Sequence, residues 1–118
     1  MITINLVKLI GSSSLLSSQK GITLYEELKN FLNEHNQLIL DFAGYEYLSS
    51  IFINRSFGQL CVDKGWNIDE LYKHIELKNV SDEDLASIEL AVSNANHRHH
   101  LISQNIDPEK YYSSACTF

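Results

Sequence analysis

The chain has 118 residues, of which 44% are hydrophobic and 20% are charged, and this balance predicts one globular domain rather than a disordered segment. The formal net charge is −6 and the nine Lys and Arg residues are scattered, which argues against nucleic acid and anionic membranes as partners, because phosphate binding needs clustered basic residues. We expect a single domain over residues 1–118, with a core over residues 2–95 and a helical extension over residues 96–118.

The N-terminal segment is predicted to be extended. Residues 2–10 alternate apolar and polar side chains at first and then become mainly apolar, which is typical of a strand. A glycine and three serines at residues 11–14 predict a turn. Leu15 and Leu16 can add a short second strand before the chain becomes loop-like again.

An amphipathic helix and a buried strand are expected next. Thr23 and Glu26 have the spacing of a capping box, so we expect the helix to run over residues 23–35. Residues 38–42 read LILDF, a short and nearly unbroken apolar run. Such a run indicates a strand that is buried on both faces of a parallel sheet.

The middle of the chain is predicted to hold a crossover and a second helix. Residues 43–48 form the crossover, and either Ser49 or Ser50 can cap a helix that runs to about Lys64. Gly65 is well placed to end this helix in the left-handed conformation. The expected inner face of the helix consists of Ile53, Phe57, Leu60 and Cys61.

The last third repeats the alternation of strand and helix. Residues 69–72 can form one helical turn, and residues 74–78 alternate as a strand does. A helix is expected to begin at Ser81 and to continue to about Ser103, and a short final helix is expected near residues 107–109. This order predicts an α/β fold with a central, mostly parallel sheet of about four strands and helices packed on it.

Nothing in the sequence predicts export. The N-terminal apolar run is too short for a secretory signal, and no stretch approaches the roughly 20 apolar residues of a membrane span. Cys61 lies in an apolar pattern, while Cys116 lies in the tail, so no disulfide is expected. We therefore expect a cytoplasmic protein. We also expect that it uses no cofactor.

The segment over residues 38–52, LILDFAGYEYLSSIF, resembles the central motif of the STAS-like domain family, a family related to domains of sulfate transporters and anti-sigma factor antagonists. In that family a buried strand ends in Leu-Asp-Phe. A loop with a glycine then leads to serines at a helix start, and Phe and a Phe-Gly pair follow on the helix. The matching residues here are Leu40, Asp41, Phe42, Gly44, Ser49, Ser50, Phe52, Phe57 and Gly58. The resemblance covers about residues 2–95 by element order and residues 38–60 by motif.

The resemblance implies a non-enzymatic regulatory module of bacterial partner switching, in which a STAS domain binds another protein. The implied partner is a histidine-kinase-like ATPase that can phosphorylate a serine at the helix start. By position Ser50 is the first candidate and Ser49 the second, and the alternative is that one of them only caps the helix. Where anti-sigma antagonists have an Asp before the serines this chain has Leu48, and it has Gln19 where family members often carry Arg.

The expected binding surface surrounds the serines. Tyr45 and Tyr47 lie in the crossover beside them, and aromatic residues are enriched at interface hot spots. Asn54 and Arg55 are expected on the outer face of the following helix, where they can add polar contacts. The sequence leaves the partner and the oligomeric state open, and a mobile-element protein that blocks a host protein would fit the same pattern.

Two further sets of residues are candidates for chemistry. Asp41 ends a buried strand, where ligands of α/β proteins gather, so a small enzyme or ligand-binding protein is the rival interpretation. The other interpretation of Asp41 is that its carboxylate accepts hydrogen bonds from loop amides. His97 and His100 share a helical face and are weak metal candidates, but zinc needs at least three protein ligands, so no metal site is predicted.

Overall fold

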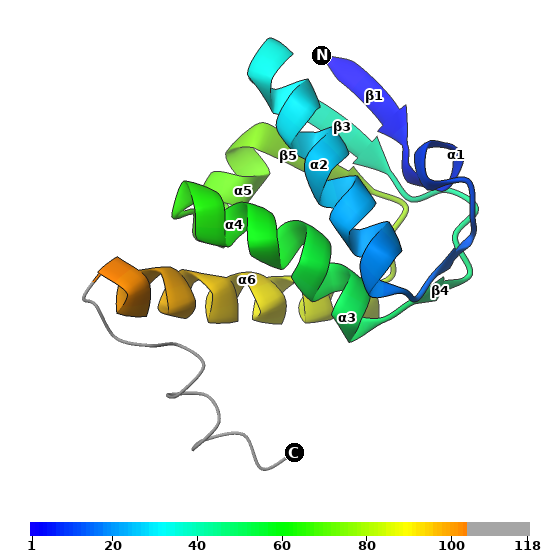
Figure 1. The fold of residues 1–118 in the computed structure, drawn as a ribbon. Coiled ribbons are helices and arrows are strands. Elements are labelled where there is room, and N and C mark those ends of the chain that lie inside the picture. Colours follow the sequence, from blue (N-terminus) through cyan, green and yellow to red (C-terminus); the bar gives the residue numbers. More distant parts are fainter. Residues whose placement is uncertain (104–118) are drawn as a thin grey trace.

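The computed structural model describes residues 1–103 (Figure 1). Parallel strands in small sheets pack against helices, which confirms the predicted α/β fold class. The elements in chain order are β1 (Ile2–Asn5), α1 (Leu6–Ile10), β2 (Ser14–Leu15), α2 (Ser18–Glu34), β3 (Leu38–Asp41), β4 (Tyr47–Leu48), α3 (Ser50–Ile53), the π-helical turn η1 (Asn54–Gly58), α4 (Gln59–Lys64), α5 (Ile68–His74), β5 (Ile75–Lys78) and α6 (Asp82–Ser103).

The strands are divided between two parallel sheets rather than lying together in one. The larger sheet has the order β1-β3-β5, and its register aligns Ile4 with Leu40 and Leu40 with Leu77. The smaller sheet pairs β2 with β4. Its second strand lies inside the segment that was expected to be an irregular crossover, so β2 and β4 connect two parts of the chain that are far apart in sequence.

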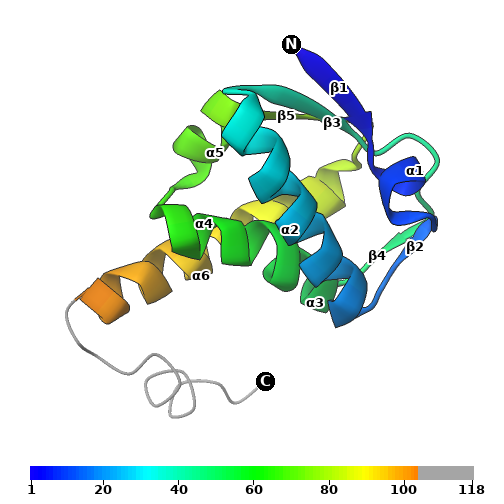
Figure 2. The ribbon, with the colours of Figure 1, turned by 45° about the horizontal axis from the view of Figure 1, so that its top comes forward.

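One face of the larger sheet packs on the core and the other faces outward. Leu38 and Leu40 are fully buried toward the helices, which Figures 1 and 2 show gathered on one side of the sheet. Ile39 and Asp41 point to the other face and are partly exposed. The prediction that this strand is buried on both faces was therefore wrong, because no described helix covers the second face.

The expected strand over residues 2–10 is half strand and half helix. β1 ends at Asn5, whose side-chain oxygen accepts a hydrogen bond from the amide of Lys8 at 2.9 Å and so caps α1. Gly11, with a φ of 79°, ends that helix in the left-handed region. The cap and the glycine decide for a helix, because the mainly apolar run of residues 6–10 fits a strand and a helix equally well.

The helix predicted over residues 23–35 begins five residues earlier than expected. Ser17 caps α2, since its hydroxyl accepts a hydrogen bond from the amide of Lys20 at 3.1 Å. Thr23 lies inside the helix, and its hydroxyl donates to the carbonyl of Gln19 at 3.0 Å instead of capping. The capping box was thus misplaced. The misleading signal was Gly21, which suggested a loop but lies buried where α2 approaches α3 and η1.

The predicted second helix is confirmed as one helical segment from Ser50 to Lys64 that contains the π-helical turn η1. Gly65, with a φ of 68°, ends it in the left-handed region, as expected. The predicted inner face is buried, and it consists of Ile53, Phe57, Leu60 and Cys61. Phe52 and Phe57 are both fully buried, and the rings of Phe57 and Phe42 are stacked with centroids 6.3 Å apart.

The C-terminal elements agree with the prediction in type. β5 and α6 were expected, and Ser81 caps α6 by accepting a hydrogen bond from the amide of Asp84 at 3.2 Å. The single helical turn foreseen near Asp69 is the longer helix α5. The short helix predicted near residues 107–109 lies outside the described residues. Within residues 1–103, no helix combines the length and hydrophobicity needed to span a membrane.

Candidate functional site

A corner of the molecule forms where the small sheet of β2 and β4 meets the start of α3 (Figure 2). The amide of Glu46 donates a hydrogen bond to the carbonyl of Ser13 at 2.9 Å. The amide of Ser49 donates to the carbonyl of Leu15 at 3.0 Å. These bonds fasten the segment that leads into α3 to the segment around β2.

The two serines at this corner have different environments. The hydroxyl of Ser49 accepts a hydrogen bond from the amide of Phe52 at 3.2 Å and donates one to the carbonyl of Leu16 at 2.9 Å. Ser49 is therefore the cap of α3. Ser50 is exposed, and its hydroxyl has no hydrogen-bond partner within residues 1–103. The structure thus leaves Ser50 as the accessible hydroxyl of the pair.

Replacing Ser49 by alanine is expected to lower the free energy of unfolding by about 1–2 kcal/mol, because the change removes the cap and the bond to Leu16. The matched change Ser50→Ala should stay within about 0.5 kcal/mol of the wild type, since it removes no intramolecular contact. Urea unfolding followed by circular dichroism measures both values. Equal losses for the two variants would contradict the distinction between a cap and a free hydroxyl.

The two tyrosines of the crossover also differ. The hydroxyl of Tyr45 donates to the carboxylate of Asp84 at 2.6 Å and accepts from the amide of Ser81 at 3.1 Å. Its ring meets that of Phe42 edge to face, with centroids 5.5 Å apart. Tyr45 therefore ties the crossover to the start of α6. The side chain of Tyr47, by contrast, is 59% exposed.

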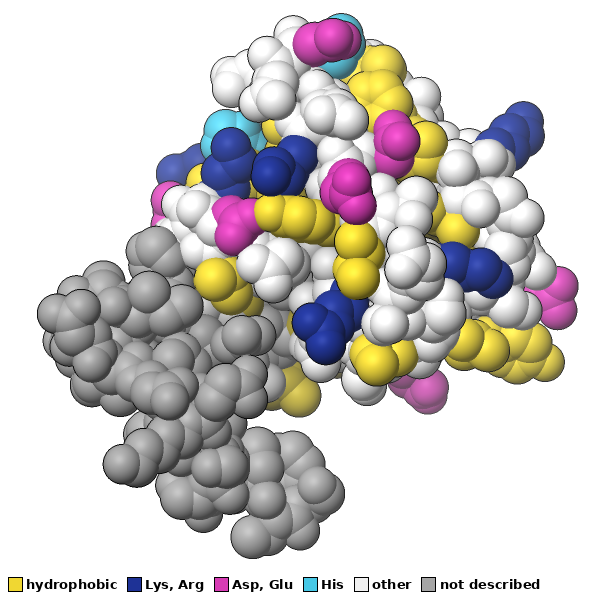
Figure 3. Space-filling model, viewed as in Figure 1, with side chains coloured by type: hydrophobic (Ala, Val, Ile, Leu, Met, Phe, Trp, Pro, Cys, Tyr) yellow, Lys and Arg dark blue, Asp and Glu magenta, His cyan; other side chains and the backbone are white. Residues whose placement is uncertain are grey.

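Exposed apolar side chains belong to the segments that meet at this corner. Leu16 is 48% exposed and Ile51 is 47% exposed, in addition to Tyr47. Figure 3 shows hydrophobic side chains at its lower right, the region of α3 and β4 in Figure 1. We call Leu16, Tyr47, Ser50 and Ile51 the corner surface. It combines three large apolar groups with one free hydroxyl, a composition suited to contact with another protein.

Asn54 and Arg55 lie in η1, and both are exposed as expected. A methyl group placed on Gly21 would come within 2.9 Å of the Cβ of Arg55, so the base of the Arg55 side chain packs close to α2. The two residues follow the corner surface along the same helical segment and extend it with polar groups.

Asp41 lies at the carboxyl end of β3 and is part of a structural network. One of its carboxylate oxygens accepts hydrogen bonds from the side-chain amide of Asn79 at 2.7 Å and from the amide of Ala43 at 2.9 Å. These bonds lower the pKa of the Asp41 carboxyl, with the bond from Asn79 the larger cause. General acid-base catalysis is most efficient when the pKa lies near the working pH, so the hydrogen bonds and the lowered pKa favour the structural interpretation of Asp41.

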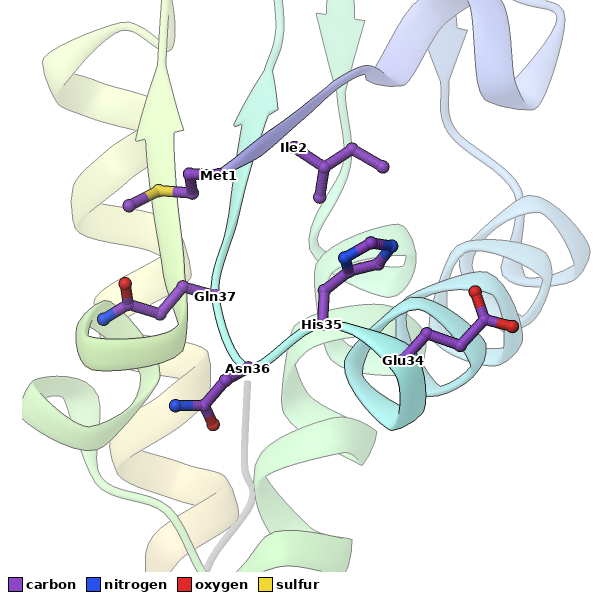
Figure 4. A pocket seen from close by; sticks show the side chains of 6 residues that line it. All are labelled: Met1, Ile2, Glu34, His35, Asn36 and Gln37. Carbon is purple, nitrogen blue, oxygen red and sulfur yellow. The ribbon is translucent and has the colours of Figure 1, made fainter.

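An open hollow of about 570 Å³ lies at the other end of the sheet, where β1 and β3 begin (Figure 4). It is lined by Met1, Ile2, Glu34, His35, Asn36 and Gln37. The hollow lies far along the strands from Asp41, at their amino ends. Asp41 and the hollow therefore do not combine into one site.

The histidine cluster lies only partly within the described residues, and the buried cysteine is shielded from reagents. His97 is on α6, and the side chain of His100 lies outside the described part of the chain. The described residues contain no group of three His, Cys, Asp or Glu side chains that could hold a metal ion. Burial raises the pKa of the Cys61 thiol to about 12, so the reactive thiolate is disfavoured.

The surface expected from the sequence did not include Leu16 and Ile51, which the structure shows to be exposed. Ile51 lies about 200° around an ideal helix from Ile53, so helical spacing alone could have placed it on the outer face. Leu16 follows the buried Leu15 at the end of a strand, where consecutive side chains point to opposite sides.

Comparison with known proteins agrees with this fold and with the motif that leads into α3. No curated protein and no solved structure matches the chain. Residues 20–85, more than half of the sequence, match the family described as STAS-like domain of unknown function (DUF4325). This match includes the strand β3, the crossover and the whole helical segment that carries Ser49 and Ser50. The chain therefore belongs to the family of STAS-like domains of unknown function.

Proposed function

We propose that this protein is a non-enzymatic regulatory module that binds another protein through the corner surface, and that modification of Ser50 controls the binding. The observation that carries the proposal is the composition of that surface. Leu16, Tyr47 and Ile51 are each about half exposed, and they belong to the same corner as the free hydroxyl of Ser50. A few side chains supply most of the affinity of a protein interface, and tyrosine is enriched among them.

The backbone beneath the corner surface is already fixed. Ser49 holds the start of α3 to the carbonyl of Leu16, and the amide of Glu46 is bonded to Ser13. Tyr45 holds the crossover to α6. A surface that is rigid before binding loses little conformational entropy when a partner docks, which supports a role in recognition.

The position of Ser50 supports control by phosphorylation. A phosphate would add a charge of about −1.5 to −2 beside apolar side chains that a partner must desolvate. Such a charge opposes docking while leaving the cap at Ser49 intact. The partner we propose is a histidine-kinase-like ATPase, as in the partner switching of STAS domains, since one protein would then both bind the corner surface and modify it.

An affinity capture from the native host tests the surface. The wild-type chain is expected to retain one partner, and Ile51→Glu should weaken its binding at least about 30-fold, as for a hot-spot residue. Leu90→Glu is the matched control, because Leu90 is 64% exposed on α6 and lies outside the corner surface. Titration calorimetry with the purified partner measures the affinities. Equal effects of the two substitutions would contradict the proposed surface.

The same complex tests the role of Ser50. Ser50→Asp is expected to weaken binding at least about 10-fold, whereas Ser50→Ala should bind as the wild type does, because only aspartate introduces a charge. Mass spectrometry of the chain after incubation with the partner and ATP then shows whether Ser50 is phosphorylated. Normal binding by Ser50→Asp would retain the interface and remove the proposed control.

A further inference from the structure

The larger sheet has an open edge at β1. The sheet order is β1-β3-β5, so β1 has a neighbouring strand on one side only. Figures 1 and 2 show no other described strand beside its outer edge. Half of the backbone N–H and C=O groups of an edge strand point away from the sheet, so β1 can accept another extended strand.

The two edges of this sheet differ in composition. β5, the opposite edge, carries Glu76 and Lys78, and charged residues protect an edge strand from pairing. β1 reads Ile-Thr-Ile-Asn, with no charge, no proline and two β-branched isoleucines. Its composition favours strand pairing, because it carries neither the charges nor the proline that discourage pairing at an edge.

We infer that β1 pairs with β1 of a second copy of this chain, antiparallel and about a two-fold axis, to form a continuous six-stranded sheet. A two-fold axis perpendicular to the sheet keeps the helices of both copies on the same side. Two residues that lie directly opposite each other in the paired strands must then have their side chains on the same side of the sheet. The register centred on Thr3 meets this condition, because Thr3 faces Thr3 and Ile2 faces Ile4 of the second copy.

This register pairs isoleucine with isoleucine on one side of the sheet and threonine with threonine on the other. Ile4 is buried on the helix side of the sheet, while Ile2 is only partly buried, beside the hollow of Figure 4. Pairing would cover Ile2 with an isoleucine of the second copy and so extend the apolar layer across the axis. Thr3 is exposed on the opposite face, where paired threonines stabilise antiparallel strands.

Charge supports a second copy as the occupant. Glu34 lines the hollow at the start of β1, while Lys8 follows its end in α1. Antiparallel pairing brings the start of one β1 to the end of the other. Glu34 of each copy and Lys8 of the other copy are then at the same end of the paired strands, where their opposite charges attract. The net charge of −6 on each copy opposes association, but salt at physiological strength screens it beyond about 8 Å.

Sedimentation equilibrium of charge-reversed variants tests the inference. The wild type is expected to dimerise with a dissociation constant on the order of 10–100 µM, as suits a small interface. Thr3→Lys and Thr3→Glu should each weaken the dimer at least about 10-fold, because each places like charges opposite one another. An equimolar mixture of the two variants should dimerise again as a heterodimer.

The control is a substitution at Glu76, a residue that is aligned with Thr3 across the three strands of the sheet. Thr3 aligns with Ile39 and Ile39 with Glu76, so Glu76→Lys changes an exposed charge on the opposite edge strand and should leave the dimer unchanged. Circular dichroism checks that each variant is folded. A wild type that remains monomeric at millimolar concentration would overturn the inference, as would a dimer that survives both changes at Thr3. Neither outcome bears on the corner surface.

Discussion

Replacing Gly21 by alanine is expected to destabilise the protein by about 2 kcal/mol, although alanine favours helices more than glycine does. A Cβ atom at Gly21 would lie 2.8 Å from the carbonyl oxygen of Phe52 and 2.9 Å from the Cβ of Arg55. Neither atom can rotate away, because both are fixed by the backbone of the α3 and η1 segment. The added methyl group must therefore push α2 away from the helical segment that carries Ser49 and Ser50.

The control for this prediction is Asn30→Ala, which lies on the exposed side of the same helix. That substitution improves helix propensity without a steric cost and should raise the free energy of unfolding by a few tenths of a kcal/mol. Urea unfolding measures both variants. If Gly21→Ala is as stable as Asn30→Ala, the close approach of α2 to η1 is not a constraint on the fold.

Gly21 also explains why the start of α2 could not be predicted from the sequence. A glycine after Ser17 and Ser18 is typical of a loop, and only the packing against Phe52 shows why a helix tolerates it. Thr23 and Glu26 then offered a plausible but incorrect cap. Local patterns succeed where the cap and the packing agree, as they do at Ser81 and Gly65.

The N-terminal error has a different physical cause. An apolar run such as residues 6–10 fits a buried strand and a buried helix equally well, and the structure decides for the helix through Asn5 and Gly11. The strand at residues 38–41 was predictable because its apolar run is short, and the strand at residues 75–78 was predictable because its apolar and polar residues alternate. The strands separate into two sheets, with β2 and β4 apart from the others, because of pairing between segments that are distant in sequence. Local sequence patterns do not predict such pairing.

The candidate site was predictable in position but not in the role of each residue. The motif located Ser49 and Ser50, yet only the carbonyl of Leu16, 33 residues away in sequence, identifies which serine is fixed. Tyr45 and Tyr47 looked equivalent in the sequence. The contact between Tyr45 and Asp84 depends on a separation of 39 residues. Such tertiary contacts decide which polar groups are fixed in the fold and which remain exposed on the surface.

A comparison of Phe57→Ala with Tyr47→Ala is expected to separate the core from the surface. Phe57 is fully buried in η1 and stacks on Phe42, so its truncation should cost about 3–5 kcal/mol of the free energy of unfolding. Tyr47 is 59% exposed, and its side chain makes no hydrogen bond within the described residues. Its truncation should therefore change stability by less than about 0.5 kcal/mol.

The binding assay completes this comparison, because a residue that acts only in recognition should change the affinity for the partner and not the free energy of unfolding. Tyr47→Ala should weaken partner binding at least about 10-fold while the unfolding curve stays that of the wild type. A loss of stability close to that of Phe57→Ala would instead show that Tyr47 packs into the fold, and the corner surface would lose its largest anchor. Unchanged stability with unchanged binding would place the interface elsewhere on the molecule.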